Sequence, residues 1–236
     1  SRRRHTRSAS VSWAREMCIR DRCGVGRPVS GLGLCEGCYC SVRGLRYRLV
    51  VEGYERVYDP SMREIFGDLI DRRYYLYVGA FGPLYKVGIT SADRMGSRRG
   101  YLTRLAEQGF GLAAVIDAGL NLIGAQDAER DIADSFGIRD RLHFDDKIMY
   151  VSYEHDEQEF RGLVEDVARF VRGEVVWFGR FSWPGFVDFD SVFDEGFLCG
   201  DFVFRRGNIV VVSNCCENLA VNLNGLVGRG IASWEV

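Results

Sequence analysis

The chain has 236 residues, of which 47% are hydrophobic and 13% aromatic, so it can bury a sizeable core. No apolar run approaches the roughly 20 residues that a membrane-spanning helix needs, and we therefore expect a soluble, cytoplasmic protein without a membrane partner. The formal net charge of −2 falls to −7 when residues 1–22 are set aside, which argues against a broad phosphate-binding surface but leaves room for one local basic patch.

Residues 1–22, SRRRHTRSASVSWAREMCIRDR, differ in character from the rest. They resemble a translated sequencing-library adapter and show no apolar periodicity, so we exclude them from fold reasoning and expect them to be disordered. The alternative is a basic arm that binds nucleic acid. We expect the natural chain to begin near Cys23, after the loss of its own start. Seven of the 31 Lys and Arg residues and two of the 33 acidic residues fall in this segment, which leaves 24 basic and 31 acidic side chains and a net charge of −7.

Residues 23–58 begin with a glycine-rich, cysteine-dense stretch, CGVGRPVSGLGLCEGCYC. Cys35 and Cys38 have the spacing at which two thiolates on a tight turn bind one tetrahedral zinc ion, and Cys23 supplies a third ligand. Cys40 is the local candidate for the fourth, although its alternation with Cys38 is awkward. We favour a structural four-cysteine zinc knuckle that has lost one ligand by truncation; free buried cysteines and a redox pair are the alternatives. Core or incidental thiols are expected at Cys199, Cys215 and Cys216.

The next regions predict an α+β fold. Residues 45–58 alternate like one or two strands. Residues 59–173 predict a small sheet with flanking helices, in this order: a helix in 60–73, a strand hairpin over 74–90, a helix over 101–108, a strand over 112–118, a helix over 124–136 and a helix over 157–172. Residues 174–236 predict a β-rich domain, a small barrel or curled sheet, in which FRRGNIV marks a hairpin reversal. Its strands could also pair with those before Asp59.

Tyrosine, glycine, arginine and glutamate follow one another in this order through the central region. Tyr75 lies in the first hairpin strand and YKVGIT in the second; RLAEQG then places Arg104 on a helix, and AQDAERDIA places Glu129 on a later one. This order resembles the GIY-YIG nuclease domain. From Cys23 to Ile231 the chain is similar to an uncharacterised prokaryotic family that joins N-terminal cysteine pairs, a GIY-YIG-like centre and a β-rich tail.

The resemblance implies a catalytic set for phosphodiester hydrolysis. Glu129 would hold Mg²⁺ or Mn²⁺, which polarises the phosphate, and Arg104 would neutralise the phosphate oxygens. Tyr75 would position or deprotonate the attacking water. Lys86 stands at the second motif's tyrosine, and Gly88 is that motif's glycine, which would admit the nucleic-acid backbone.

Two departures from the family pattern matter. Lys86 replaces a tyrosine, and the neighbouring Tyr85 cannot substitute for it because adjacent strand residues point to opposite faces. The segment between Gly88 and Arg104 is longer than usual, and it carries the densest basic cluster outside residues 1–22. This cluster is either a phosphate-contacting loop or a solvated surface loop; it comprises Arg94, Arg98 and Arg99.

Purely structural roles compete at each position. Tyr75 could be core, Glu129 a surface ion pair, and Arg104 a packing stem; we expect His143 and His155 to be structural. The leading hypothesis is a nucleic-acid-directed protein with divalent-metal endonuclease activity on DNA or RNA. The alternatives are a non-catalytic nucleic-acid- or nucleotide-binding module with a structural zinc site, and a zinc-stabilised interaction scaffold. Convergence of Tyr75, Arg104 and Glu129 on one accessible site would separate these hypotheses; the oligomeric state is left open.

Overall fold

The structure is a computed structural model that describes residues 41, 45, 48–49, 63–92, 100–183, 188–193, 200–214 and 216–223. The chain forms two compact units, residues 1–58 with 224–236, and Asp59–Leu223. The adapter-like segment lies outside the described residues, as do the four predicted zinc ligands and the three arginines of the predicted phosphate-contacting loop.

In the first unit the structure differs from the predicted strands. The described residues Leu45, Arg48 and Leu49 are helical, and the Leu45 amide donates to the Ser41 carbonyl at 2.8 Å. This spacing of four residues is that of an α-helix.

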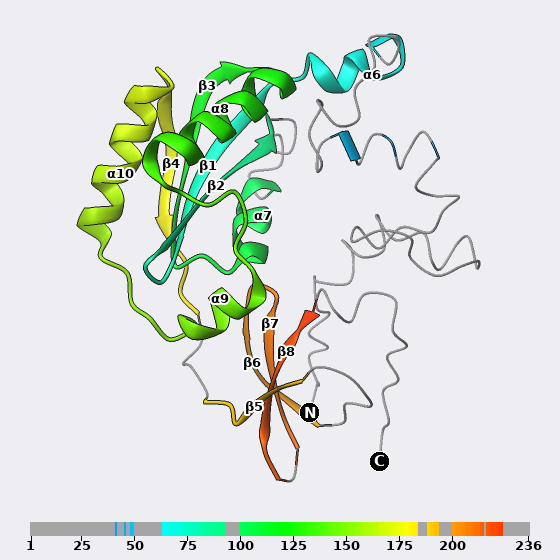
Figure 1. The fold of residues 1–236 in the computed structure, drawn as a ribbon, viewed down its shortest axis with the longest axis vertical. Helices are drawn as coiled ribbons and strands as arrows, with labels where there is room; N and C mark the ends of the chain where they lie inside the picture. Colours follow the sequence, from blue (N-terminus) through cyan, green and yellow to red (C-terminus); the bar gives the residue numbers. More distant parts are fainter. Residues whose placement is uncertain are drawn as a thin grey trace, which may run out of the picture. The chain divides into compact units, whose positions relative to one another are not determined.

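The second unit has a mixed α+β fold with a β-rich C-terminal region, which confirms the predicted class (Figure 1). Its elements are α6 (Arg63–Ile70), β1 (Tyr74–Phe81), β2 (Leu84–Ser91), α7 (Gly100–Gln108), β3 (Leu112–Leu120), α8 (Leu122–Phe136), α9 (Phe144–Met149), α10 (Glu157–Phe170), β4 (Glu174–Arg180), β5 (Ser191–Phe193), β6 (Asp201–Arg206), β7 (Ile209–Ser213) and β8 (Asn218–Asn222). They form two four-stranded sheets, ordered β2-β1-β3-β4 and β5-β8-β7-β6.

The hairpin of β1 and β2 sets the register of the first sheet. Phe81 pairs with Leu84, so the turn contains only Gly82 and Pro83. Gly82 has a φ of 61°, a conformation that favours glycine and suits a two-residue hairpin turn. Because β2 is an edge strand, its outer side is open to the segments that follow.

The first sheet is covered on both faces. One face carries Leu76, Val78 and Val87, and it packs against buried residues of α8 and α10 such as Ile132 and Phe160. The other face carries Tyr77 and Phe81 of β1. It packs against Leu105 of α7 and against three residues of β6 and β7, namely Phe204, Ile209 and Val211. The second sheet therefore shares a hydrophobic core with the first.

The C-terminal region differs from the prediction in how its strands pair. The segment EVVWFGR forms β4, which pairs antiparallel with β3 and extends the first sheet. The remaining strands form an open sheet in which β5 and β8 are parallel and the other pairs antiparallel. The predicted reversal in FRRGNIV is confirmed, since Gly207 and Asn208 join β6 to β7 and Gly207 has a φ of 61°.

Candidate functional site

The three charged residues that the sequence singles out come from three elements, Lys86 from β2, Arg104 from α7 and Glu129 from α8. All three are partly buried. Arg104 and Glu129 both act electrostatically on Lys86, and Lys86 and Arg104 both act on Glu129. The fold thus brings the three side chains into one cluster, which we call the Lys86 cluster.

Lys86 lies on the edge strand with its ammonium group inside this cluster. The pKa of Lys86 is lowered to about 8: burial is the largest cause, the charge of Arg104 acts in the same direction, and the charge of Glu129 opposes it. The segment after α8 runs along the edge of β2. The Val87 amide donates to the Arg139 carbonyl at 3.1 Å, and the Arg139 amide donates to the Tyr85 backbone carbonyl at 3.2 Å. This pairing brings two exposed residues, Asp140 and Arg141, within electrostatic range of Lys86.

Glu129 sits on the buried side of α8. The buried residues Ala125 and Ile132 lie four residues before it and three after it, so all three share one side of the helix. The helix is fixed at both ends: the Asn121 side chain accepts from the Gly124 amide, and Gly137 adopts a left-handed conformation as C-cap. Burial raises the pKa of Glu129 to about 7, and Lys86 opposes that rise.

Tyr77 is a buried neighbour of the Lys86 cluster. Its side chain is only 2% exposed. Burial raises its pKa, whereas the charge of Arg104 and a hydrogen bond with that side chain lower it. A buried tyrosine hydroxyl needs a partner, and Arg104 supplies one. Tyr77 therefore orients Arg104 and is itself closed to a large ligand.

The glycine of the second motif serves packing. Gly88 pairs with Tyr77 across the hairpin, and a Cβ at Gly88 would overlap the Tyr77 ring. The space above Gly88 is therefore filled by protein, whereas the sequence-based expectation reserved it for a nucleic-acid backbone. Gly79 is similar, since a Cβ there would lie 2.5 Å from the Phe110 ring.

Tyr75, the tyrosine of the predicted catalytic set, lies two residues before Tyr77 on β1. It pairs with Thr90, faces the same side of the sheet as Tyr77, and is partly buried at the margin of the second core. The tyrosine whose pKa responds to Arg104 and Glu129 is Tyr77. The sequence held a signal for this, because a two-residue Gly-Pro turn pairs residue 77 with residue 88.

A second lysine, Lys147, lies within electrostatic range of Lys86 and Arg104. Lys86 and Lys147 are the only lysines of the chain. The pKa of Lys147 is lowered to about 7, mainly by burial and to a lesser extent by the charges of Lys86, Arg104 and Arg206. Unlike arginine, lysine can give up its proton in such a setting, so its rarity elsewhere could have drawn attention to this pair.

Glu129 and the nearby Asp140 are the carboxylates that would hold the expected magnesium ion. Within the described part of the chain, no group of three or more His, Cys, Asp or Glu side chains is arranged to hold a metal ion. Mg²⁺ is often held by one or two carboxylates together with substrate phosphate oxygens and water. Glu129 fits that pattern with Asp140 nearby, while the ammonium of Lys86 competes for the same carboxylate.

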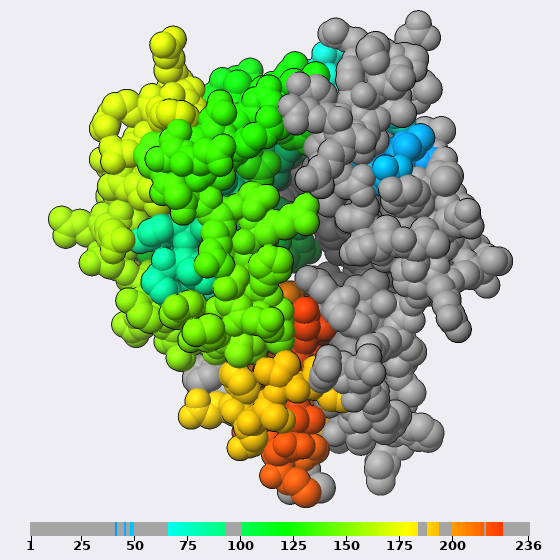
Figure 2. Space-filling view, viewed as in Figure 1, coloured from blue at the N-terminus to red at the C-terminus, as the bar shows by residue number. Residues whose placement is uncertain are grey.

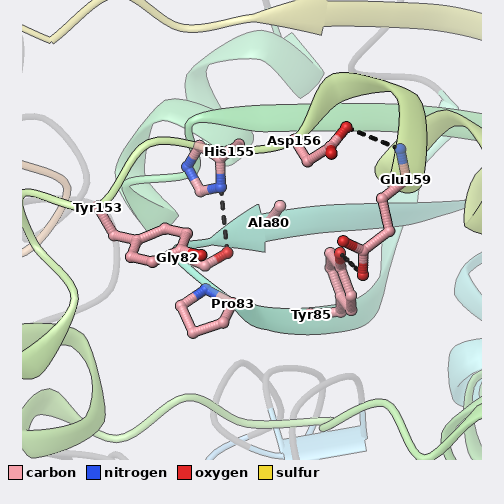
Figure 3. A pocket seen from close by; sticks show the side chains of 8 residues that line it. All are labelled: Ala80, Gly82, Pro83, Tyr85, Tyr153, His155, Asp156 and Glu159. Carbon is pink, nitrogen blue, oxygen red and sulfur yellow. Dashed lines mark hydrogen bonds between the residues drawn. The ribbon is translucent and has the colours of Figure 1, made fainter.

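A separate pocket lies at the turn of the β1–β2 hairpin (Figure 3). It has a volume of about 80 Å³ and is lined by Ala80, Gly82, Pro83, Tyr85, Tyr153, His155, Asp156 and Glu159. The Tyr85 hydroxyl donates to Glu159 at 2.8 Å, so Tyr85 points away from the Lys86 cluster, as strand alternation predicts. Figure 2 shows the hairpin, in teal, reaching the surface among the green and yellow-green segments that follow it.

Comparison of the chain with protein-family models, with curated proteins and with solved structures found no match. Among the described residues, no helix is both long enough and apolar enough to cross a membrane. In the Lys86 cluster, several cations surround one carboxylate at a partly exposed site, an arrangement suited to binding an anion.

Proposed function

We propose that the protein acts on nucleic acid and that the Lys86 cluster is a GIY-YIG-type site for hydrolysis of phosphodiester bonds. The observation that carries this proposal is the electrostatic coupling of Lys86, Arg104 and Glu129, which come from separate elements. The succession of two strands, a helix, a strand and a helix in β1–α8 supports it, because the family resemblance places the tyrosine, glycine, arginine and glutamate on such elements in that order.

Each residue has a distinct part in the proposed chemistry. Arg104 binds the scissile phosphate through its planar guanidinium, and Tyr77 holds that guanidinium in place. Lys86 adds a second positive charge beside the phosphate. Glu129 would hold a divalent ion, Mg²⁺ or Mn²⁺, and such an ion would supply Lewis-acid polarisation of the phosphate.

The proposal is tested with single- and double-stranded DNA and RNA, with and without Mg²⁺ or Mn²⁺. We expect metal-dependent cleavage by the wild type and a loss of orders of magnitude in Glu129→Gln, which keeps the shape but removes the anionic oxygen. Glu165→Gln is the matched control, because Glu165 is exposed on α10. Cleavage that survives Glu129→Gln would contradict the catalytic assignment.

A second candidate function is favoured by one observation. Lys86 takes the place of the tyrosine, and its ammonium group lies within electrostatic range of Glu129, where it competes with a divalent cation. In that case the cluster binds a phosphate group of nucleic acid or nucleotide without cleaving it. A wild type that binds oligonucleotides, leaves them intact with either metal ion, and loses affinity in Arg104→Gln would support this binding module.

A further inference from the structure

We propose that Lys147 and Arg206 are positioning residues that hold the C-terminal end of α7, and through this helix the side chain of Arg104. The inference rests on the proposed function only in treating Arg104 as the phosphate-binding residue. It assigns a role to the C-terminal sheet, because Arg206 lies on β6 and one partner of Lys147 lies in the β6–β7 turn.

Lys147, from α9, is 5% exposed. Its Nζ donates to the backbone carbonyl of Gln108 at 2.8 Å and to Oδ1 of Asn208 at 3.0 Å. Gln108 is the last residue of α7, where carbonyl groups lack partners within the helix and carry a partial negative charge. Arg104 lies four residues earlier, on the same side of the helix. The hydrogen bond from Lys147 to Gln108 therefore restrains the end of α7, one turn from Arg104.

Arg206 holds the adjoining turn. It is also 5% exposed, and its Nε donates to the Gly109 carbonyl at 2.9 Å, while another guanidinium nitrogen donates to the Val151 carbonyl. Gly109 and Gly207 both have positive φ, and a Cβ at Gly207 would lie 2.6 Å from the Gly109 amide nitrogen. The end of α7 and the β6–β7 turn thus meet backbone to backbone, with Arg206 bonded across the contact.

His155 keeps the Arg206 guanidinium in place. Its Nδ1 lies 3.1 Å from the Gly82 carbonyl, and its Nε2 lies 3.1 Å from the third guanidinium nitrogen of Arg206. A carbonyl only accepts, so Nδ1 carries the proton and Nε2 accepts from Arg206. Burial lowers the pKa of His155 to about 4, with a further contribution from Arg206, so the ring is neutral at neutral pH and suits a cationic neighbour.

The two cations share one aromatic side chain. The Phe81 ring centroid lies 5.6 Å from Lys147 Nζ and 4.1 Å from the centre of the Arg206 guanidinium, both within range of a cation–π interaction. In the described part of the chain no ion pair joins either cation to a carboxylate. Apolar residues would fill this space at a lower desolvation cost. Unlike apolar residues, Lys147 and Arg206 donate directed hydrogen bonds to the end of α7 and the turn that follows it.

The test compares Lys147→Met and Arg206→Met with wild type by hydrogen–deuterium exchange, with Arg169→Met as the matched control because Arg169 is exposed on α10. We expect exchange in α7 to accelerate about tenfold while α8 and α10 are unchanged, because the effect is local opening of one helix. Exchange in α7 that stays at the wild-type rate would overturn the proposal, as would equal acceleration in all three helices. Should either variant fail to fold, Asn208→Ala removes only one partner of Lys147 and should accelerate α7 alone, to a smaller extent.

Activity provides a second readout. Where the wild type cleaves or binds an oligonucleotide, both Met variants should lose about tenfold or more of that activity, as we also expect for Arg104→Gln, because a misplaced arginine contacts the phosphate poorly. Full activity in both variants would contradict positioning of Arg104. A wild type inert toward nucleic acid would overturn the proposed function alone, since the exchange measurement still decides whether these residues hold α7.

Discussion

Tyr77 lies directly opposite Gly88 across the β1–β2 hairpin, and its ring occupies the space that a side chain at Gly88 would need. The same ring carries the hydroxyl that hydrogen-bonds with Arg104. One pair of residues therefore links the packing of the sheet to the orientation of the proposed phosphate-binding group.

Gly88→Ala should destabilise the protein by about 1–3 kcal/mol, the range typical of an overpacked core. Urea denaturation measures this change. Thr90→Ala serves as a comparison, because Thr90 is also buried, lies two residues further along the same face of β2 and is paired with Tyr75, but the substitution adds no volume. A Gly88→Ala variant as stable as wild type would show that Tyr77 does not need this space.

The pH dependence of cleavage should be a narrow bell. At a metal-ion concentration well below saturation, activity should rise as metal-free Glu129, with a pKa near 7, loses its proton, and fall as Lys86, with a pKa near 8, loses its charge. Because Glu129 and Lys86 interact, the two apparent pKa values of the profile belong to the pair and not to either residue alone. In Lys86→Met the falling limb should vanish and the rising limb should move to higher pH, since Lys86 lowers the pKa of Glu129. A rising limb unmoved in Lys86→Met would contradict this coupling.

Stability should rise with pH above neutrality, in part through Lys147. Burial lowers its pKa to about 7 from the reference value of 10.5, so between these values the unfolded chain binds more protons than the folded one. Raising the pH through this window therefore stabilises the fold. Between pH 7 and pH 10 the free energy of unfolding of the wild type should therefore rise relative to that of Lys147→Met. A difference independent of pH would refute a lowered pKa at Lys147.

The predicted zinc knuckle calls for a separate measurement. Protein in which the cysteine-rich segment is preceded by its natural residues should contain about one equivalent of zinc by elemental analysis. Cys35→Ser should lose most of it, whereas Cys199→Ser, at a position without metal spacing, should not. Substoichiometric zinc in the first protein would contradict the prediction.

The sequence predicted best those elements whose signal is local. The hairpin follows from two apolar runs around Gly82 and Pro83, and α8 from its apolar periodicity. The helix α9 was missed because FDDKIM spans six residues, too few to show a period. The partner of β4 was missed because strand pairing depends on residues far apart in sequence, and alternation alone does not identify the neighbour.

Within the candidate site, charged residues were easier to anticipate than their supports. Lys86, Arg104 and Glu129 stood out by residue type and order. Tyr77 and Arg206 did not, because a tyrosine in a strand and an arginine in a β-rich tail resemble ordinary core and surface residues. Their significance depends on register and on contacts between sheets, such as the bond from Arg206 to Gly109. The expected structural role of His155 agrees with its bond to Gly82.

The most direct test of the central claim is metal-dependent cleavage measured together with thermal unfolding in Glu129→Gln and Arg104→Lys. We predict melting temperatures close to wild type for Arg104→Lys, together with reduced turnover, because lysine keeps the charge but loses the bidentate contact. For Glu129→Gln we predict a folded protein without cleavage. Wild-type cleavage rates in both folded variants would contradict a catalytic site at the Lys86 cluster.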